Sequence, residues 1–461
     1  MSEPQVIILG AGLTGISASY HLGHDNCLVL EAKEHTGGHI HSKQVNGFTW
    51  DEGPHVSFTK HQYVKDLFAK SPADGFLEFK VFPTNYYKGH WIPHPAQSNL
   101  YAVPEPLRTQ CFNDFLEKRK QSSEGFQADD YGQWLTEAFG ETFANTFPYE
   151  YTKKYWTVPP HMLGTSWVGN RVFYPDVDVV KRGYEGVPED STHYITSIRY
   201  PKRGGYYSYA SLMKEGMKVH LNRQVVRVDL EAQEVLCSDG SRYPYKALIS
   251  TLPLPEFIAC CGAPEEIQTA AGELSCSQLL IFNFEVAHPP TRTEQWMYVY
   301  DSDMYSTRIN FTDLLSPGNA PEGKCGIQVE VYFSKYRPLD KPIEEIKDKV
   351  TQELVQMGLI RSEDQVAAVH SEWIPYANVI FDHPYEGAMD RVLGWLEGYG
   401  LKREEDDLLP MTDWEKKMEG DERLGRLVLA GRFGQWKYYW TDDCVLRGKL
   451  IAERVAISRK P

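Results

Sequence analysis

The fold is decided by the stretch Val6-Ile-Ile-Leu-Gly10-Ala-Gly12-Leu13-Thr14-Gly15, which continues through a helical pattern to Cys27-Leu-Val-Leu-Glu31. The two apolar runs predict buried strands, and the residues between them predict a glycine turn and a helix. Gly10 would allow the tight turn, Gly12 would let backbone N–H groups approach a pyrophosphate, and Gly15 would let the helix pack against the strand. A dinucleotide-binding unit is favoured over an ordinary turn, because the strand, helix and final acid are in register.

Glu31 follows Gly10 at about the twenty-residue distance expected for an acid that accepts hydrogen bonds from a ribose. A second glycine pair, Gly37-Gly38, follows soon after Glu31. It predicts another backbone turn near the first, suited to a long cofactor that continues past the pyrophosphate. FAD is therefore favoured over NAD. We expect cofactor contacts at Gly10, Gly12, Leu13, Thr14, Gly15, Glu31, Ala32, Gly37, Gly38 and His39.

This N-terminal pattern resembles the flavoprotein group that includes amine oxidases, protoporphyrinogen oxidase and UDP-galactopyranose mutase. In many members an Arg follows the glycine pair, whereas this chain has His39.

Length and composition limit the alternatives. The 461 residues are enough for two or three domains, and 42% hydrophobic with 24% charged residues is typical of a soluble globular protein. The net charge of -15 argues against a nucleic-acid-binding surface, so an anionic substrate would need a local basic pocket. The acidic runs Arg403 to Asp407 and Glu415 to Glu422 are predicted to be solvated faces or loops.

The eight cysteines include no C-x-x-C pair, so neither a zinc site nor a disulfide framework is expected. We expect reduced thiols in a cytoplasmic protein that binds no metal. The nucleotide strand begins at Val6 without a signal-peptide pattern before it, and no apolar run is long enough to span a bilayer.

A hairpin is predicted around Asn46-Gly47, followed by Trp50-Asp-Glu-Gly53-Pro54-His55. The latter could be a plain surface loop, but it resembles the loop that covers the isoalloxazine ring in UDP-galactopyranose mutases of the eukaryotic type. That resemblance implies that His55 is a neighbour of the flavin.

The segment from Gly89 to Leu100 is rigid and rich in proline. Its counterpart in the mutases reads Tyr-Pro-Phe-Gln-Asn-Asn and lines the nucleotide pocket. This chain keeps Gln97 and Asn99, but His94 and Ala96 replace the family's aromatic residues.

Helical spacing dominates from about Leu107 to Arg171 and predicts a helical insertion. Its aromatic residues taken singly could equally be core. The insertion ends in Trp167-Val-Gly-Asn-Arg171-Val172, which resembles the mutase motif Trp-x-Gly-x-Arg-Val. The resemblance implies that Trp167 and Arg171 lie beside the flavin and the sugar phosphate.

Strands return near Val225 and at Ala247 to Ser250. This return resembles the second half of the FAD domain, and the resemblance implies that the backbone of Val225 or Val226 meets adenine. From Leu279 to Phe333 alternating strands predict an antiparallel sheet with one face open to a ligand. Arg308 lies mid-strand there; an ordinary surface Arg is the alternative, but its segment resembles the one whose Arg binds the nucleotide pyrophosphate. His383 stands where true mutases have a phosphate-binding Tyr, unless that Tyr is displaced to Tyr385.

The C-terminal stretch Gly431-Arg432-Phe433-Gly-Gln-Trp436-Lys-Tyr438 predicts a glycine turn and an aromatic loop. A helix capped by Thr441 to Asp443 is expected from about Cys444 to Val455, with its N-terminus aimed at the flavin. The stretch resembles Gly-Arg-Phe-Gly-x-Trp-x-Tyr of the eukaryotic-type mutases. This implies cofactor contacts at Gly431, Arg432, Trp436 and Tyr438, with Tyr438 also a phosphate ligand.

The predicted fold class is α/β, with a discontinuous Rossmann-like FAD-binding domain, a helical insertion and an antiparallel-sheet substrate domain. We assign residues 1–90, 214–255 and 424–461 to the first, 100–185 to the second, and 186–213 and 256–423 to the third.

The resemblance implies a UDP-galactopyranose-mutase-like isomerisation of pyranose to furanose, in which N5 of reduced FAD is the nucleophile and no net oxidation occurs. It assigns catalysis to His55, Arg171 and Arg308. Substrate binding is expected at Gln97, Asn99, Trp167, Arg171, Arg308, His383 and Tyr438.

Two alternatives remain open: an FAD-dependent oxidoreductase of the amine oxidase or protoporphyrinogen oxidase type, and a nucleotide-binding protein without chemistry. The expected partner is a small-molecule sugar nucleotide, together with a reductant for which NAD(P)H is one candidate. The sequence leaves the sugar and the oligomeric state open.

Overall fold

The computed structural model describes residues 6–121, 126–169, 172, 174–187 and 197–455. Within them a five-stranded parallel sheet has the order β19-β13-β1-β2-β9. Its members come from distant parts of the chain, which confirms the α/β class and the Rossmann-like unit. They are β1 (Val6–Leu9), β2 (Cys27–Leu30), β9 (Val219–His220), β13 (Ala247–Ser250) and β19 (Leu427–Leu429).

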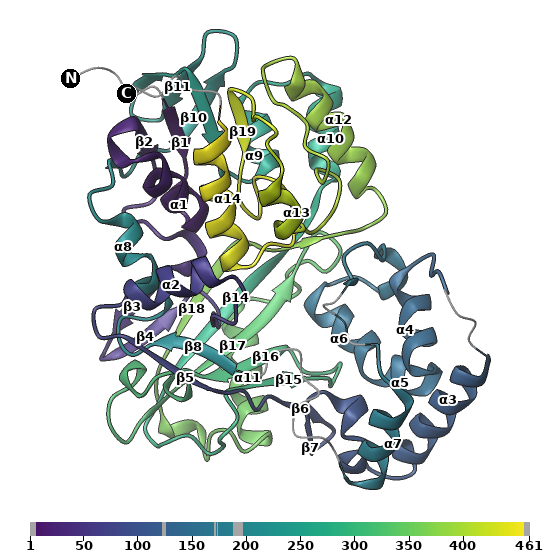
Figure 1. Cartoon of the computed structure of the whole chain (residues 1–461). Coiled ribbons are helices and arrows are strands. Elements are labelled where there is room, and N and C mark those ends of the chain that lie inside the picture. The colour runs from purple at the N-terminus through teal and green to yellow at the C-terminus, as the bar shows by residue number, and fades with distance from the viewer. Residues whose placement is uncertain (1–5, 122–125, 170–171, 173, 188–196, 456–461) are drawn as a thin grey trace.

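Two helices from opposite ends of the chain, α1 (Leu13–Leu22) and α14 (Thr441–Arg454), lie side by side against this sheet (Figure 1). Ser17 Oγ donates to Val445 O at 2.7 Å, and a Cβ added at Gly448 would lie 2.4 Å from Ser17 Oγ. Gly448 therefore allows the close packing. The predicted start of α14 was three residues late, because the backbone N–H of Trp440 is capped by the Asp443 carboxylate at 2.5 Å.

Smaller strand groups connect the main layers. β3 (Ser42–Val45) and β4 (Phe48–Asp51) form the predicted hairpin, with Asn46 and Gly47 at φ 52° and 85°. The remaining groups are β10 (Val225–Asp229), β11 (Glu234–Cys237) and β12 (Arg242–Pro244) in one antiparallel sheet, and β5 (Phe76–Lys80) with β8 (Ser197–Pro201) in another.

A second large sheet has the order β18-β14-β17-β16-β15-β6-β7 among the described residues. It is mixed rather than purely antiparallel, because β6 pairs with β15 in parallel. β6 belongs to this sheet and lies within residues 1–90, the first range predicted for the FAD domain. The strands are β6 (Thr84–Tyr87), β7 (His90–Pro93), β14 (Ser275–Val286), β15 (Trp296–Val299), β16 (Arg308–Phe311), β17 (Cys325–Phe333) and β18 (Val366–Ile380).

The two faces of this sheet differ in chemistry. Leu280, Phe282 and Phe284 on β14 pack with alternate residues of β17 and with α11 (Ile343–Gln356). The residues between them face the opposite side, where Leu279 and Ile281 meet Tyr332. This period of two leaves one face for a ligand, as the alternation predicts.

The helices between β7 and β8 form a group at one end of the second sheet (Figure 1). These are α3 (Leu107–Gln121), α4 (Tyr131–Phe139), α5 (Glu141–Thr146), α6 (Pro148–Tyr155) and α7 (Val177–Glu185). The other helices are α2 (Gln62–Lys70), α8 (Ser211–Lys214), α9 (Leu254–Cys260), α10 (Glu265–Glu273), α12 (Tyr385–Glu397) and α13 (Trp414–Glu419).

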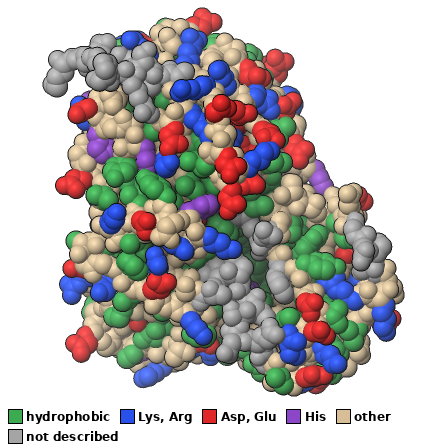
Figure 2. Space-filling view, in the orientation of Figure 1, with side chains coloured by type: hydrophobic (Ala, Val, Ile, Leu, Met, Phe, Trp, Pro, Cys, Tyr) green, Lys and Arg blue, Asp and Glu red, His purple; other side chains and the backbone are tan. Residues whose placement is uncertain are grey.

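The segment around α13 corrects one prediction. Acidic side chains gather on the molecular surface over this region (Figure 2), and Glu415 and Glu422 are exposed as expected. The run Arg403 to Asp407 is different, because the side chains of Glu404, Asp406 and Asp407 are only 8%, 13% and 12% exposed. Basic side chains from other elements approach these carboxylates, and charge in a run of sequence could not show that.

Candidate active site

The first glycine turn has the geometry that its motif predicts. Gly10 has φ +93°, and a Cβ added at Gly15 would lie 2.1 Å from the carbonyl oxygen of Gly10. Any side chain at Gly15 would therefore separate α1 from β1. The N-terminus of α1 begins after Gly12 without a side-chain cap, so its backbone N–H groups remain available to an anion.

The second glycine pair meets the first turn directly. Gly37 N–H donates to Ala11 O at 2.8 Å, and a Cβ added at Gly38 would lie 3.0 Å from Gly12 Cα. Together the two turns expose backbone rather than side chains along one wall, which fits the pyrophosphate of a dinucleotide.

Glu31 stands immediately after β2 and fixes the edge of this wall. Its carboxylate accepts from Ala11 N at 2.7 Å and from Lys33 N at 2.9 Å. A carboxylate has about four acceptor positions, so the remaining ones suit ribose hydroxyls.

A cavity of about 750 Å³ runs from these turns to the open face of the second sheet. It is lined by most residues expected at the site. Those are Gly10, Gly12, Leu13, Thr14, Glu31, Ala32, Gly37, Gly38, His39, His55, Trp167, Arg308, Gly431, Arg432 and Tyr438.

Six other expected residues among those described do not line the cavity, and five of them lie away from the first glycine turn. Val226 lies on β10 with 46% of its surface exposed, and exposed His383 engages His161 O through Nε2 at 3.0 Å. Asn99 donates to Pro95 O at 3.0 Å in a segment packed against α7, which also removes Gln97 from the cavity. Trp436 is buried behind Phe433.

Gly15 likewise acts behind the turn, through packing. Arg171 lies outside the described residues.

A row of polar residues crosses four adjacent strands at the far end of the cavity. Asn85 pairs with Tyr298, Tyr298 with Arg308, and Arg308 with Glu330. Cross-strand partners point to the same face, so sheet register alone assembles this row. His94 reaches it from behind, with Nδ1 at 3.0 Å from Asn85 Oδ1 and its ring 4.8 Å from that of Tyr298.

Arg308 is held by Glu330 in a two-pronged ion pair. Nε and Nη2 donate to the carboxylate at 2.6 and 2.8 Å, and the Tyr332 hydroxyl donates to it at 2.9 Å. Burial opposes the charge on Arg308, but Glu330 outweighs this and raises the pKa of Arg308. Arg308 begins β16 rather than lying in its middle, so its side chain stands at the strand's edge, 24% exposed.

Tyrosines form the rest of this end and were missed individually in the sequence. Burial raises the pKa of each hydroxyl on Tyr131, Tyr151, Tyr155, Tyr298, Tyr300 and Tyr332, so these phenols are neutral and can donate hydrogen bonds. Two of them, Tyr151 and Tyr155, are one helical turn apart on α6. That spacing was the available signal, because residues four apart share a helix face.

The C-terminal turn supplies Arg432 and Tyr438. Arg432 Nη2 donates to Asn378 Oδ1 at 3.0 Å, and its guanidinium lies 5.3 Å from the Tyr438 ring. No carboxylate among the described residues forms an ion pair with Arg432. Trp167 stands beside Tyr438, with 6.4 Å between the rings.

His55 faces the middle of the cavity. Its Nδ1 lies 3.0 Å from Gly53 O and is assigned as the donor, which leaves Nε2 as an acceptor. Burial lowers the pKa of His55 to about 4, so the ring is neutral at pH 7. Nearby, Glu52 pairs with His39 at 3.3 Å; burial raises the pKa of Glu52, but the contact with His39 outweighs it and lowers that pKa overall.

Metal clusters and membrane-spanning helices are both absent from the described residues. No group of three or more His, Cys, Asp or Glu side chains there could hold a metal ion. Nor does the described part of the chain contain a helix long and apolar enough to cross a membrane.

Comparison with solved structures shows the fold. A reduced UDP-galactopyranose mutase has a TM-score of 0.86 at 24% identity, over 97% of this chain and 93% of that chain. A putative protoporphyrinogen oxidase from Exiguobacterium sp. 255-15 has a TM-score of 0.69 at 15% identity, over 98% of both chains.

Comparison with curated sequences gives shorter matches. The chain is 23% identical over 268 residues to polyamine oxidase 4 of Oryza sativa subsp. japonica, covering 55% of this chain and 52% of that protein. It is 26% identical over 156 residues to protoporphyrinogen oxidase 2, chloroplastic/mitochondrial, of Arabidopsis thaliana, covering 31% and 30%. The chain thus spans about half or less of these relatives' length.

The sequence profile described as flavin containing amine oxidoreductase matches residues 13–456. This range begins at Leu13, directly after the first glycine turn, and holds the second glycine pair and every other residue that lines the cavity. With the backbone-lined wall suited to a dinucleotide, the match means that the protein belongs to the flavin containing amine oxidoreductase family and that its cofactor is FAD.

Proposed function

We propose that the protein is a sugar-nucleotide mutase that interconverts the pyranose and furanose forms of a sugar attached to a nucleoside diphosphate. The observation that carries the proposal is one continuous cavity that joins the glycine turns to Arg308, Arg432 and a wall of tyrosines. A flavin end and a phosphate-and-hydroxyl-binding end are what this reaction requires. The fold shared with the reduced mutase supports the same conclusion.

In this reaction reduced FAD supplies the nucleophile through its N5 atom. The chain's own residues hold the sugar in place and stabilise the departing diphosphate. Arg308 suits the second task, because its two bonds to Glu330 fix the guanidinium plane and leave the other N–H donors for phosphate oxygens. Arg432 adds a cation with no ionic partner among the described residues.

His55 has a narrower role than general acid. Being neutral, with Nδ1 engaged by Gly53 O, it can accept a hydrogen bond or a proton at Nε2. We assign it to accepting a hydrogen bond beside the flavin. Arg171 remains proposed from its motif alone.

The competing function is an FAD-dependent oxidoreductase acting on an amine or a ring carbon. It is favoured by the curated relatives, which are named polyamine and protoporphyrinogen oxidases. It is also favoured by Glu330, because this carboxylate offsets the charge that Arg308 would present to a diphosphate.

Anaerobic incubation separates the two functions. The protein is reduced chemically and mixed with UDP-galactopyranose or related sugar nucleotides, and products are resolved by chromatography. The mutase predicts a furanose product from reduced protein, none from oxidised protein, and no reductant consumed per turnover. Steady oxygen uptake driven by putrescine or spermidine, without isomerisation, would contradict the mutase proposal and support the oxidoreductase.

A further inference from the structure

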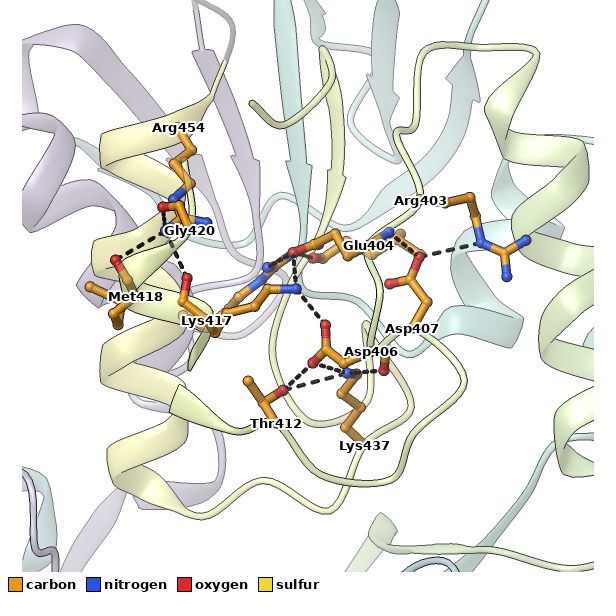
Figure 3. Close-up of polar contacts among 12 residues, drawn as sticks. Arg403, Glu404, Asp406, Asp407, Thr412, Lys417, Met418, Gly420, Lys437 and Arg454 are labelled. Carbon is orange, nitrogen blue, oxygen red and sulfur yellow. Dashed lines mark hydrogen bonds and ion pairs between the residues drawn. The ribbon is translucent and has the colours of Figure 1, made fainter. Parts of the chain in front are cut away.

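A buried ionic cluster gathers around Lys437 of the C-terminal turn (Figure 3). We call Glu404, Asp406, Lys417, Lys437 and Arg447 the Lys437 cluster. None of its side chains is more than 13% exposed, and that of Lys437 is 1% exposed. The members come from the segment after α12, from α13, from α14 and from the turn itself.

Lys437 is fully engaged on the side away from the cavity. Its ammonium donates to Asp406 Oδ2 at 2.6 Å, to Asp406 O at 2.5 Å and to Thr412 Oγ1 at 3.4 Å. These three acceptors match the three donors of an ammonium group.

The rest of the cluster ties this contact to rigid elements. Glu404 accepts two bonds from Arg447 at 2.6 and 2.8 Å, and Arg447 also donates to Leu429 O at 2.9 Å on β19. Lys417 bridges the two acids, contacting both Glu404 and Asp406. The cluster therefore joins the parallel sheet to the turn through charged groups.

Stability alone is a poor explanation for such a cluster. Removing charges from water costs several kcal/mol per ion, and buried ion pairs often only offset that cost. The clearest benefit of a buried pair is a fixed arrangement of the backbone that carries it.

The backbone beside Lys437 needs such fixing. Trp436 has φ 55°, in the left-handed region, where a residue with a side chain is strained. Lys437 N–H donates to Arg432 O at 2.9 Å, and Tyr438 N–H donates to Pro410 O at 2.7 Å. The turn thus presents Arg432 and Tyr438 to the cavity while Lys437 anchors it from behind.

We propose that Lys437 is a positioning residue, whose ion pair with Asp406 sets the turn so that Arg432 and Tyr438 meet the phosphate groups of a nucleoside diphosphate. The ligand class in this proposal rests on the function proposed above; the anchoring itself rests on the contacts of Lys437.

Lys437→Met tests the proposal, with Lys417→Met as a matched control. Both changes remove an ammonium from Asp406, but only Lys437 belongs to the turn. UDP and uridine are titrated by calorimetry into flavin-loaded protein, with thermal melting and flavin content measured alongside. Both variants should melt earlier. Lys437→Met should weaken UDP binding about tenfold and uridine binding much less, whereas Lys417→Met should stay within about twofold of wild type.

The outcomes are separable. If wild type binds UDP and Lys437→Met binds it no more weakly than Lys417→Met does, the cluster is only structural and the proposal is wrong. If wild type does not bind UDP, the proposed function fails and takes this ligand class with it. Should Lys437→Met give no flavin-loaded protein, Asp406→Asn replaces it: this change keeps an oxygen acceptor for Lys437 but removes the charge, and must still weaken UDP binding more than Lys417→Met does.

Discussion

The two ends of the cavity recognise their ligands by different means. At the nucleotide end, Gly10, Gly12, Gly37 and Gly38 present backbone, and the carboxylate of Glu31 is held by backbone N–H groups. We call the opposite end, where the tyrosines surround Arg308, the aromatic end. There, side chains on the second sheet and α6 form the wall. The first end depends on the absence of side chains, and the second on their register.

The difference indicates which kind of substitution disturbs each end of the cavity. A new side chain at Gly10, Gly15 or Gly38 would collide with neighbouring atoms, whereas a lost side chain at the aromatic end leaves the backbone in place and removes only that side chain's own contacts. Substitutions at the nucleotide end should therefore either abolish FAD binding or leave it unchanged. Substitutions at the aromatic end should change ligand affinity or stability by intermediate amounts.

The largest effect is expected at Gly15. In Gly15→Ala the added Cβ would lie 2.1 Å from Gly10 O, so α1 or the turn must move. Overpacking commonly costs about 1–3 kcal/mol, and backbone cannot yield as a side chain does. We expect protein without FAD or without a folded parallel sheet, measured by visible absorbance and circular dichroism. Gly272→Ala on α10, with nothing within 4 Å, is the control and should retain full flavin content. A yellow Gly15→Ala protein of normal stability would contradict the comparison.

A second large effect concerns how α6 is attached to the aromatic end. Lys154 Nζ donates to Asp301 O and Ser306 O, each at 2.7 Å, and burial lowers the pKa of Lys154 to about 7. Between pH 7 and about 10.5 the unfolded chain then binds more protons than the folded one, so Lys154 makes stability rise with pH across that window. A neutral amine still has two N–H donors for the two carbonyls.

To check this, the stability of wild type and of Lys154→Met is measured by thermal melting from pH 7 to pH 9. Wild type should gain up to about 2–3 kcal/mol relative to the variant over these two pH units. Other groups that titrate in this range cancel in the comparison. Parallel stability curves for the two proteins would show that Lys154 is already charged in the folded state.

The third effect is at Arg308, where a loss of ligand affinity can be distinguished from a loss of stability. Arg308→Ala should weaken UDP binding about tenfold or more and weaken uridine binding much less, with FAD content unchanged. Arg308→Lys should recover part of the loss, because a point charge replaces a two-pronged donor. Calorimetry with UDP and uridine measures both.

Glu330 provides the control for Arg308. Arg308→Ala leaves the Glu330 carboxylate 1% exposed without its cation, which is destabilising. The double change Arg308→Ala with Glu330→Gln should recover stability without recovering UDP affinity. If affinity returned together with stability, Arg308 would be a structural residue and the diphosphate assignment would be lost.

The contrast between the two ends also explains what the sequence could predict. The nucleotide end is local: a strand, a turn and a helix within about thirty residues carry all its chemistry, and the C-terminal turn repeats that situation. Its geometry agrees with expectation at Gly10, Gly15 and Gly38. Likewise the alternation of apolar residues showed that the second sheet has one open face.

The side chains at the aromatic end are brought together by the pairing register of the strands, which cannot be read from the sequence. Nothing near Arg308 indicates that Glu330 lies opposite it or that Tyr298 lies on its other side. Partners can also make a local pattern misleading: Glu404 and Asp406 looked like a solvated run until Arg447 and Lys437 were placed beside them. His383 and Val226 were assigned from position in a motif, and the chain turns both away from the cavity.

The smallest effect should come from single hydroxyls at the aromatic end, and α6 offers a matched pair. Tyr151 and Tyr155 are stacked with 5.8 Å between their rings, and both line the cavity. The Tyr155 hydroxyl donates to Asn378 Oδ1 at 3.3 Å, the atom that also accepts from Arg432. The Tyr151 hydroxyl makes no hydrogen bond with the described residues, so none of them competes with a ligand for it.

Tyr151→Phe should therefore lower UDP-sugar affinity by about two- to tenfold, the value of one neutral hydrogen bond of roughly 0.5–1.5 kcal/mol, and leave the melting temperature unchanged. Tyr155→Phe should do the reverse: a small loss of stability, with affinity nearly kept because Asn378 still accepts from Arg432. Calorimetry and thermal melting on the same two preparations measure both quantities. Equal affinities for wild type and Tyr151→Phe would mean that the tyrosines at this end pack against the ligand without hydrogen bonding to it, which would favour a less polar substrate and hence the oxidoreductase.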